Sequence, residues 1–193
     1  IMRRLYLSFA IISLTLIVSC QRKPSTQFDK IPSTVTGIEY NNIINENEYF
    51  NILTFEYFYN GGGVGIGDFN NDGLSDIFFS GNVVNNRLYL NKGDLHFKDV
   101  SAEAGIQASD KWCTGVAVVD INLDGWLDIY VCVSGGAPEA ERANLLYINN
   151  GLGGLPSTPA GSSPSPSGRA GEGLTFTESA AEYGLADTRQ SLR

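Results

Sequence analysis

Hydrophobic positions recur with a period of two along much of this chain, and two acidic loops interrupt the alternation. In "GVGIG" (63–67) aliphatic residues alternate with glycines, and "GVAVV" (115–119) keeps a similar order. A period of two predicts a β-strand. A second apolar run leaves each loop, "DIFF" (76–79) or "DIYVCV" (128–133). Its crowded aliphatic and aromatic residues predict a strand that is buried on both faces.

These runs belong to an internal repeat, because further blocks recur in the same order. "RLYLNKGD" (87–94) aligns with "LLYINNG" (145–151), and "HFKDVSAEAGI" (96–106) aligns with "TFTESAAEYGL" (175–185). The glycine-containing connection "NKGD" predicts a hairpin. The last block predicts one helical turn that a left-handed glycine closes, Gly105 or Gly184. Each repeat thus predicts about four short strands and one turn, which is the content of a β-propeller blade. The predicted fold is all-β, an incomplete β-propeller of about two blades.

Two segments depart from the repeat. Residues 152–173 are rich in Gly, Pro and Ser, and such a composition cannot bury enough apolar surface to offset its ordering entropy. We therefore predict a disordered insertion at a hairpin tip, with a proline-rich docking ligand as the alternative. The aromatic stretch "YFNILTFEYFYNGGG" (49–63) predicts a strand that enters the first blade. One alternating face of this strand carries Phe55, Tyr57 and Tyr59. We expect this face to pack into the core, and the alternative is that it binds sugar rings.

The N-terminus predicts a signal peptide over residues 1–19. Arg3 and Arg4 precede an apolar run that ends at Ser19, which is the order of a secretory signal. The run is shorter than the ~20 residues of a membrane span, so a transmembrane anchor is the less favoured alternative. The residues "IVSC" (17–20) resemble a bacterial lipobox. This resemblance implies cleavage before Cys20, lipid on that cysteine, and a polar tether up to residue 35.

Charge limits the partners. The chain carries a formal charge of −8, and removal of Arg3 and Arg4 with the signal peptide makes the mature chain more acidic still. A strongly acidic protein is repelled by nucleic acid, and its negative charge favours the binding of cations. We expect a cell-envelope protein held to a membrane by its lipid, on either the periplasmic or the surface face.

Two further cysteines flank the second acidic loop. If the runs around that loop form a hairpin, Cys132 lies opposite a residue near Val116, an odd number of places from Cys113. An odd offset places the two side chains on opposite faces of the sheet. We expect two buried thiols rather than a disulfide, although a shift of one residue in register would reverse this.

The acidic loops "DFNNDGLSD" (68–76) and "DINLDGWLD" (120–128) carry the candidate chemistry. Positions 1, 3, 5 and 9 supply side-chain oxygens, position 6 is glycine, and position 7 offers a backbone carbonyl. Calcium takes six to eight oxygen ligands of this kind, whereas magnesium demands a tighter octahedron. The predicted ligands of two calcium sites are Asp68, Asn70, Asp72, Leu74 and Asp76, and Asp120, Asn122, Asp124, Trp126 and Asp128.

Two alternatives to this assignment are weaker. An EF-hand shares the D-x-[DN]-x-[DN]-G order but also needs glutamate at position 12 and flanking helices. Position 12 is Phe79 or Val131 here, and both flanks predict strands. An acidic hairpin without metal would need no more than Asx turns, and two loops that match at every ligand position make that reading less favoured.

The two repeats resemble FG-GAP or VCBS repeats, which occur in the integrin α-subunit propeller and in many secreted or lipid-anchored bacterial proteins. The resemblance covers about residues 36–187 outside the insertion. This part of the chain is similar to the opening blades of bacterial lipoproteins of that group. The resemblance implies a propeller stiffened by calcium and used for binding or adhesion rather than catalysis. Asn70 and Asn122 stand where Asp is common in that pattern.

The predicted function is therefore a calcium-binding, membrane-anchored binding or adhesion module with an unknown protein or glycan ligand. The alternatives are part of a polysaccharide-processing or uptake protein, or a truncated fragment without activity. We predict no enzyme and no catalytic residue, and the single histidine, His96, predicts a surface position. The predicted segments are a signal peptide (1–19) and a lipidated cysteine with its tether (20–35). A strand and the first repeat follow (36–110), and then the second repeat with its insertion (111–187). Residues 188–193 are the truncated start of a third repeat.

Overall fold

The computed structural model describes residues 27–106, 108, 111–135, 142–152 and 173–186. The chain divides into two units, residues 1–31 and 32–193, and all elements below belong to the second. The predicted signal peptide, Cys20, nearly all of the 152–173 insertion and the 188–193 segment lie outside the described residues. Within the described ranges, no helix is long and apolar enough to cross a membrane.

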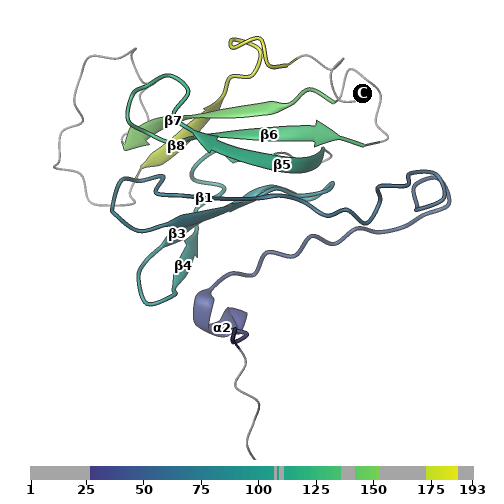
Figure 1. The fold of residues 1–193 in the computed structure, drawn as a ribbon, viewed down its shortest axis with the longest axis horizontal. Helices are drawn as coiled ribbons and strands as arrows, with labels where there is room; N and C mark the ends of the chain where they lie inside the picture. The colour runs from purple at the N-terminus through teal and green to yellow at the C-terminus, as the bar shows by residue number, and fades with distance from the viewer. Residues whose placement is uncertain (1–26, 107, 109–110, 136–141, 153–172, 187–193) are drawn as a thin grey trace, which may run out of the picture. The chain divides into compact units, whose positions relative to one another are not determined.

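The second unit is built from two four-stranded antiparallel sheets (Figure 1). The first sheet has the order β1 (Val64–Gly67), β2 (Asp76–Phe79), β3 (Arg87–Asn91) and β4 (Phe97–Asp99). The second has the order β5 (Trp112–Val119), β6 (Asp128–Ser134), β7 (Leu145–Leu152) and β8 (Leu174–Glu178). The short helix α2 (Ser33–Thr36) precedes them. The all-β class and the four strands per repeat are confirmed, and the architecture is that of two propeller blades.

Side chains of the two sheets meet in one main core. The fully buried members include residues of both blades, namely Phe69, Phe78, Leu88, Leu90, Cys113, Ile129 and Val131. Gly65 of β1 lies close to β5, because a Cβ at Gly65 would come within 2.8 Å of Val116 Cγ1 and 2.9 Å of Val118 Cγ2. The glycines of the "GVGIG" run therefore leave room for the valines of the neighbouring sheet.

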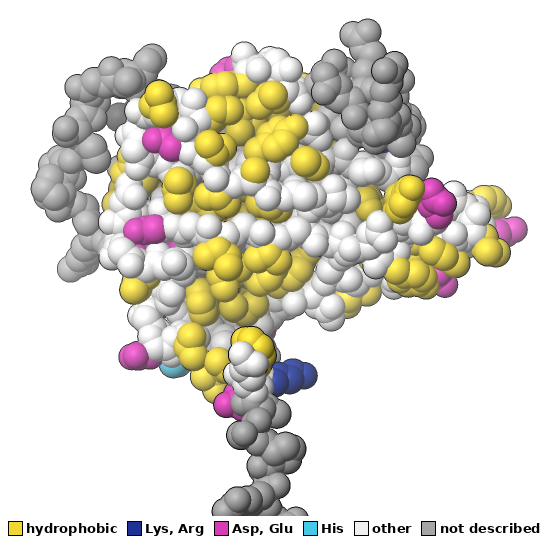
Figure 2. Space-filling model, in the orientation of Figure 1, with side chains coloured by type: hydrophobic (Ala, Val, Ile, Leu, Met, Phe, Trp, Pro, Cys, Tyr) yellow, Lys and Arg dark blue, Asp and Glu magenta, His cyan; other side chains and the backbone are white. Residues whose placement is uncertain are grey.

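The opposite face of the first sheet is only partly covered. Val64 and Ile66 remain 53% and 63% exposed, and Figure 2 shows hydrophobic side chains in patches over the sheets on the face it displays. In β2, Phe78 is buried whereas Ile77 and Phe79 are half-buried. The prediction that β2 and β6 would be buried on both faces is thus wrong, because each strand packs one face on the other sheet and leaves its second face partly open.

A hydrogen-bonded turn closes each repeat, as predicted. Ile106 N donates to Ser101 O at 2.9 Å, and Leu185 N donates to Ala180 O at 2.8 Å. The glycine before each donor is left-handed, with φ of 74° at Gly105 and 68° at Gly184. These i+5 to i bonds across a left-handed glycine are the closure that ends a helical turn.

The aromatic stretch before β1 forms consecutive turns, so the predicted strand over 49–63 is wrong. Phe50, Phe55 and Phe58 surround Trp112 at ring centroid distances of 5.4, 5.1 and 5.8 Å. Phe58 is fully buried, whereas Tyr57 is 52% exposed. A three-residue spacing on a turn brings Phe55 and Phe58 to the same partner, which the assumed alternation did not anticipate. Core packing was the favoured role for Phe55, Tyr57 and Tyr59. It fits the half-buried Phe55, which packs on Trp112. It is wrong for Tyr57 and for Tyr59, which is 66% exposed, because the turn directs Phe58 inward instead.

The two strand cysteines are free thiols on opposite faces of the second sheet. Cys113 pairs in register with Val133, one residue away from Cys132, across a bulge between Cys113 and Val116. Cys113 is buried and Cys132 is exposed. The expectation that both would be buried is wrong, because Cys132 lies on the sheet face that points away from the main core. Burial raises the pKa of the Cys113 thiol to about 11.

Candidate cation-binding loops

Each acidic loop is held by its own side chains. The Asp68 carboxylate accepts hydrogen bonds from Asp72 N at 3.0 Å and from Gly73 N at 2.8 Å. Asp120 accepts the equivalent bonds from Asp124 N at 3.1 Å and Gly125 N at 2.9 Å. The first position of each loop therefore folds the chain back on itself, as Asp does when it caps a turn.

The middle of each loop repeats a second set of bonds. Asn70 Nδ2 donates to Asp72 Oδ2 at 2.9 Å, and Leu74 N donates to Asp72 Oδ1 at 2.9 Å. The second loop has the same two bonds at 2.9 Å, made by Asn122, Asp124 and Trp126. Leu74 is 38% exposed and Trp126 is half-buried. Predicted positions 3, 5 and 7 are thus neighbours in both loops.

The last position of each loop is a buried carboxylate at the start of a strand. Asp76 is fully buried and accepts bonds from Phe69 N at 2.9 Å and Asn91 N at 2.8 Å. Asp128 is equally buried and accepts bonds from Ile121 N at 2.9 Å and Asn149 N at 2.8 Å. Burial raises the pKa of both carboxyl groups to about 6, against the lowering effect of these backbone donors.

The loop backbone needs two left-handed residues. Position 6 is glycine, with φ of 86° at Gly73 and 89° at Gly125, as predicted for a sharp turn. Position 4 is also left-handed, with φ of 54° at Asn71 and 59° at Leu123. Asparagine visits this region readily, whereas a residue such as leucine does so at a cost. The nine-residue pattern gives no role to position 4.

Asn91 and Asn149 support the loops from outside them, and the nine-residue pattern does not include either residue. Besides donating its N–H to the buried aspartate, each supports the loop with its side chain. Asn91 Nδ2 donates to Ser75 O at 3.0 Å, and Asn149 Nδ2 donates to Leu127 O at 3.1 Å. The signal was present, since the asparagine aligns in "RLYLNKG" and "LLYINNG". It lies outside the nine-residue loops, so the loop pattern does not include it.

The donor set of each loop suits a hard cation, although the acids do not form a preassembled cage. Three carboxylates, one amide oxygen and one backbone carbonyl per loop are all oxygen ligands of the kind calcium takes. An ionised carboxylate has about four lone-pair sites, so the two hydrogen bonds at Asp68, and likewise at Asp76, leave acceptor capacity. Among the described residues, however, no three His, Cys, Asp or Glu side chains converge closely enough to hold a metal ion. The loops therefore match a calcium site in the type and sequence order of their oxygen donors, and not in the convergence of their carboxylates.

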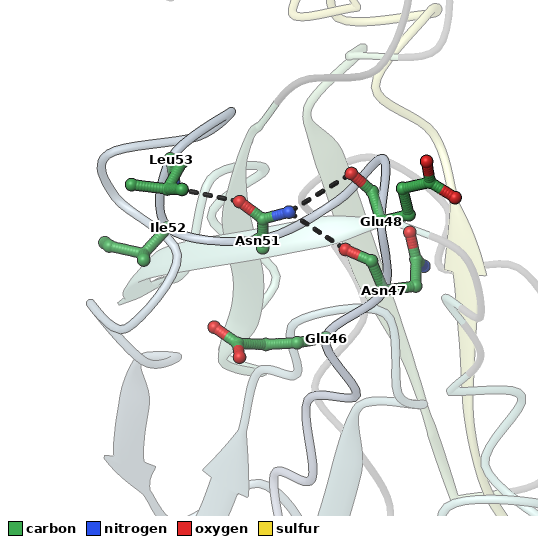
Figure 3. A pocket seen from close by; sticks show the side chains of 6 residues that line it. All are labelled: Glu46, Asn47, Glu48, Asn51, Ile52 and Leu53. Carbon is green, nitrogen blue, oxygen red and sulfur yellow. Dashed lines mark hydrogen bonds between the residues drawn. The ribbon is translucent and has the colours of Figure 1, made fainter.

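A pocket of about 430 Å³ lies elsewhere, on the turns before β1 (Figure 3). Its lining comes from one contiguous stretch, and the Asn51 amide at its centre already donates to Asn47 O and Glu48 O at 2.9 and 3.3 Å. The pocket is the concave side of this turn. His96 lies in the β3–β4 hairpin and is exposed, as predicted.

Comparison with known proteins supports the repeat. The family model for the FG-GAP-like repeat matches residues 68–131, from the start of the first loop into β6. Cartilage acidic protein 1 of Xenopus tropicalis is 39% identical over 72 residues, which is 37% of this chain and 11% of that protein. The protein of the same name in Homo sapiens is 40% identical over the same length and shares. The chain thus spans about a tenth of the length of these curated relatives. They are vertebrate proteins, so the likeness to bacterial lipoproteins stays a prediction.

Proposed function

We propose that this chain is a propeller-type binding or adhesion module whose two acidic loops bind calcium, and that calcium stiffens the blades. An FG-GAP-like repeat is typical of such modules rather than of enzymes, and we propose no catalytic residue. The ligands would be the oxygen donors already predicted, with Asp68, Asp72 and Asp76 as the charged members of the first loop. The second loop would use the equivalent residues.

One observation carries the proposal most strongly. The two loops make the same hydrogen bonds at position after position, including a buried aspartate tied to the third strand of its sheet at 2.8 Å. An acidic hairpin without a ligand would need only the turn-forming bonds at positions 1 and 5. The repeated placement of carboxylates at all of positions 1, 5 and 9 is what a divalent ion would compensate.

Calcium should act on stability. Extracellular calcium modules have dissociation constants of roughly 10⁻⁴ to 10⁻³ M. At about 1 mM calcium, linkage then gives ~0.4 to 1.4 kcal/mol of folding free energy per site. We therefore expect EGTA to lower the melting temperature by several degrees and to speed proteolysis within 68–76 and 120–128. Unchanged melting and unchanged cleavage in EGTA would mean that the ion is not structural.

Binding itself is tested by removing one carboxylate from each loop. We expect calorimetry to detect two calcium sites in the parent chain and none in the double variant Asp72→Ala, Asp124→Ala. The matched control is Glu103→Ala, Glu182→Ala, which removes the same charge from exposed positions outside the loops and should keep both sites. Calcium binding by the loop variant equal to that of the parent would overturn the proposal.

We also propose that the chain is attached to a membrane of the cell envelope through lipid on Cys20, facing an unknown protein or glycan. The support is the lipobox-like "IVSC" and the acidic charge of −8, which disfavours nucleic acid. Cys20→Ser should abolish labelling by a fatty-acid analogue and release the protein from the membrane fraction. Membrane association that persists without labelling would point to an uncleaved apolar anchor.

A further inference from the structure

The two acidic loops contact each other directly. Asn71, at position 4 of the first loop, donates its side-chain N–H to the carbonyl of Gly125 in the second loop at 3.2 Å. Asn71 is exposed, and its backbone is left-handed (φ 54°). The loops belong to different sheets, so this bond joins the blades at the proposed cation sites.

A buried side chain makes a second and stronger connection. Asn149 of β7 is fully buried. Its Nδ2 donates to Phe69 O at 2.9 Å, in the first loop, and to Leu127 O at 3.1 Å, in the second. Its Oδ1 accepts from Gly151 N at 2.9 Å. One amide group therefore supports both loops, and its orientation is fixed by a third bond.

Asn91 has the matching place in the first sheet but a smaller reach. Its Nδ2 donates to Ser75 O of its own loop, and its Oδ1 accepts from Gly93 N at 2.9 Å. Its own loop is therefore the one that this amide supports. The difference between Asn91 and Asn149 arises because the second sheet lies against the first loop. The pair thus offers a natural internal comparison.

We propose that Asn149 is a positioning residue that couples the two acidic loops, so that ordering one loop favours ordering the other. The coupling itself needs no metal. A second part of this inference rests on the proposed function: calcium bound at one loop strengthens the binding of calcium at the other loop. A buried carbonyl left without its donor is costly, so loss of the Asn149 amide should loosen Phe69 and Leu127 together.

Hydrogen exchange without calcium tests the coupling alone. In Asn149→Ala we expect amides of both 68–76 and 120–128 to exchange about tenfold faster, as the loss of one or two buried hydrogen bonds predicts. Asn91→Ala should speed exchange in 68–76 alone. Asn150→Ala is the control on the same strand, because its amide contacts Thr175 and Thr177, and it should change neither loop. Faster exchange confined to 120–128 in Asn149→Ala would overturn the coupling.

Calcium titration separates the failure of this inference from failure of the proposed function. With Asp124→Ala the first site alone remains, and adding Asn149→Ala should weaken it about tenfold, although residue 149 lies in the other sheet. With Asp72→Ala the second site remains, and Asn149→Ala should weaken it whereas Asn91→Ala should not. No binding in the parent chain would defeat the calcium proposal and leave the exchange result standing. Binding at the first site that is indifferent to Asn149→Ala would defeat the coupling alone.

A second variant keeps the test informative if Asn149→Ala does not fold. Asn71→Gly retains the left-handed backbone and removes only the exposed bond to Gly125 O. It should speed exchange of the amides in both loops about fivefold, with unchanged exchange in the sheet strands. Protection in both loops equal to that of the parent would overturn the contribution of the Asn71 bond to the coupling and leave Asn149 as the link between the loops.

Discussion

At the scale of single residues, the two loops share one unusual backbone conformation but place different side chains there. Position 4 is left-handed in both, and it is Asn71 in the first loop and Leu123 in the second. The Cβ of an ordinary residue crowds the backbone in this region, which costs roughly 1–2 kcal/mol. Asparagine reduces the cost by local hydrogen bonding. Leu123 gains little in return, because 78% of it is exposed.

We therefore expect Leu123→Asn to stabilise the chain by about 1 kcal/mol and to raise the melting temperature by about 2–4 °C, measured in EGTA so that metal does not contribute. Leu123→Ala is the control, since alanine keeps the Cβ and the left-handed cost. Equal melting temperatures for the two variants would show that the backbone at position 4 is not strained.

At the scale of elements, strand parity decides the fate of the two cysteines. Cys113 and Cys132 lie on neighbouring strands, one register place apart, so one thiol enters the main core and the other faces outward. The bulge between Cys113 and Val116 changes the register that simple pairing about the loop predicts. The thiolate is the reactive form, and burial of Cys113 reduces both access and ionisation.

In a Cys20→Ser background at pH 8, we expect a maleimide to label one thiol quickly, at Cys132. Cys113 should label only on unfolding, because its pKa of about 11 leaves very little thiolate at that pH. Cys132→Ser should abolish the fast phase, and Cys113→Ser should leave it unchanged. A fast phase that survives in Cys132→Ser would mean that the assigned face of β5 is wrong.

At the scale of the whole molecule, close approach between the sheets depends on particular small residues. Gly63 and Gly115 occupy the same place in the two repeats. A Cβ at Gly63 would lie 2.3 Å from the backbone oxygen of Thr114, in the other sheet. A Cβ at Gly115 would lie 3.7 Å from Cys132 Sγ, an ordinary contact. The same residue type is thus required at one place and optional at the other.

We expect Gly63→Ala to destabilise the chain by about 1–3 kcal/mol, the usual cost of overpacking, because Thr114 O cannot move without shifting its strand. Gly115→Ala should change the unfolding free energy by much less. Urea unfolding of the two variants measures the difference. Equal stabilities would indicate that the sheets do not approach as closely as the structure has them.

The sequence by itself determined the elements and the order of oxygen-bearing residues in the two loops. Period-two alternation, the recurring loops and the closing glycines predicted four strands and a turn per repeat, because these signals depend on neighbouring residues alone. It also identified residues 68–76 and 120–128 as the candidate site. The prediction for the 49–63 stretch is wrong, because Phe50, Phe55 and Phe58 pack around Trp112 in a distant strand.

Only the tertiary structure decided how the two repeats act on each other. The outward position of Cys132 and the support of both loops by Asn149 depend on one sheet lying against the other. No local pattern encodes which carbonyl a buried amide will reach. Asn149 and Phe69 are joined by a bond that spans 80 residues of sequence, and only the packing of the two sheets brings them together.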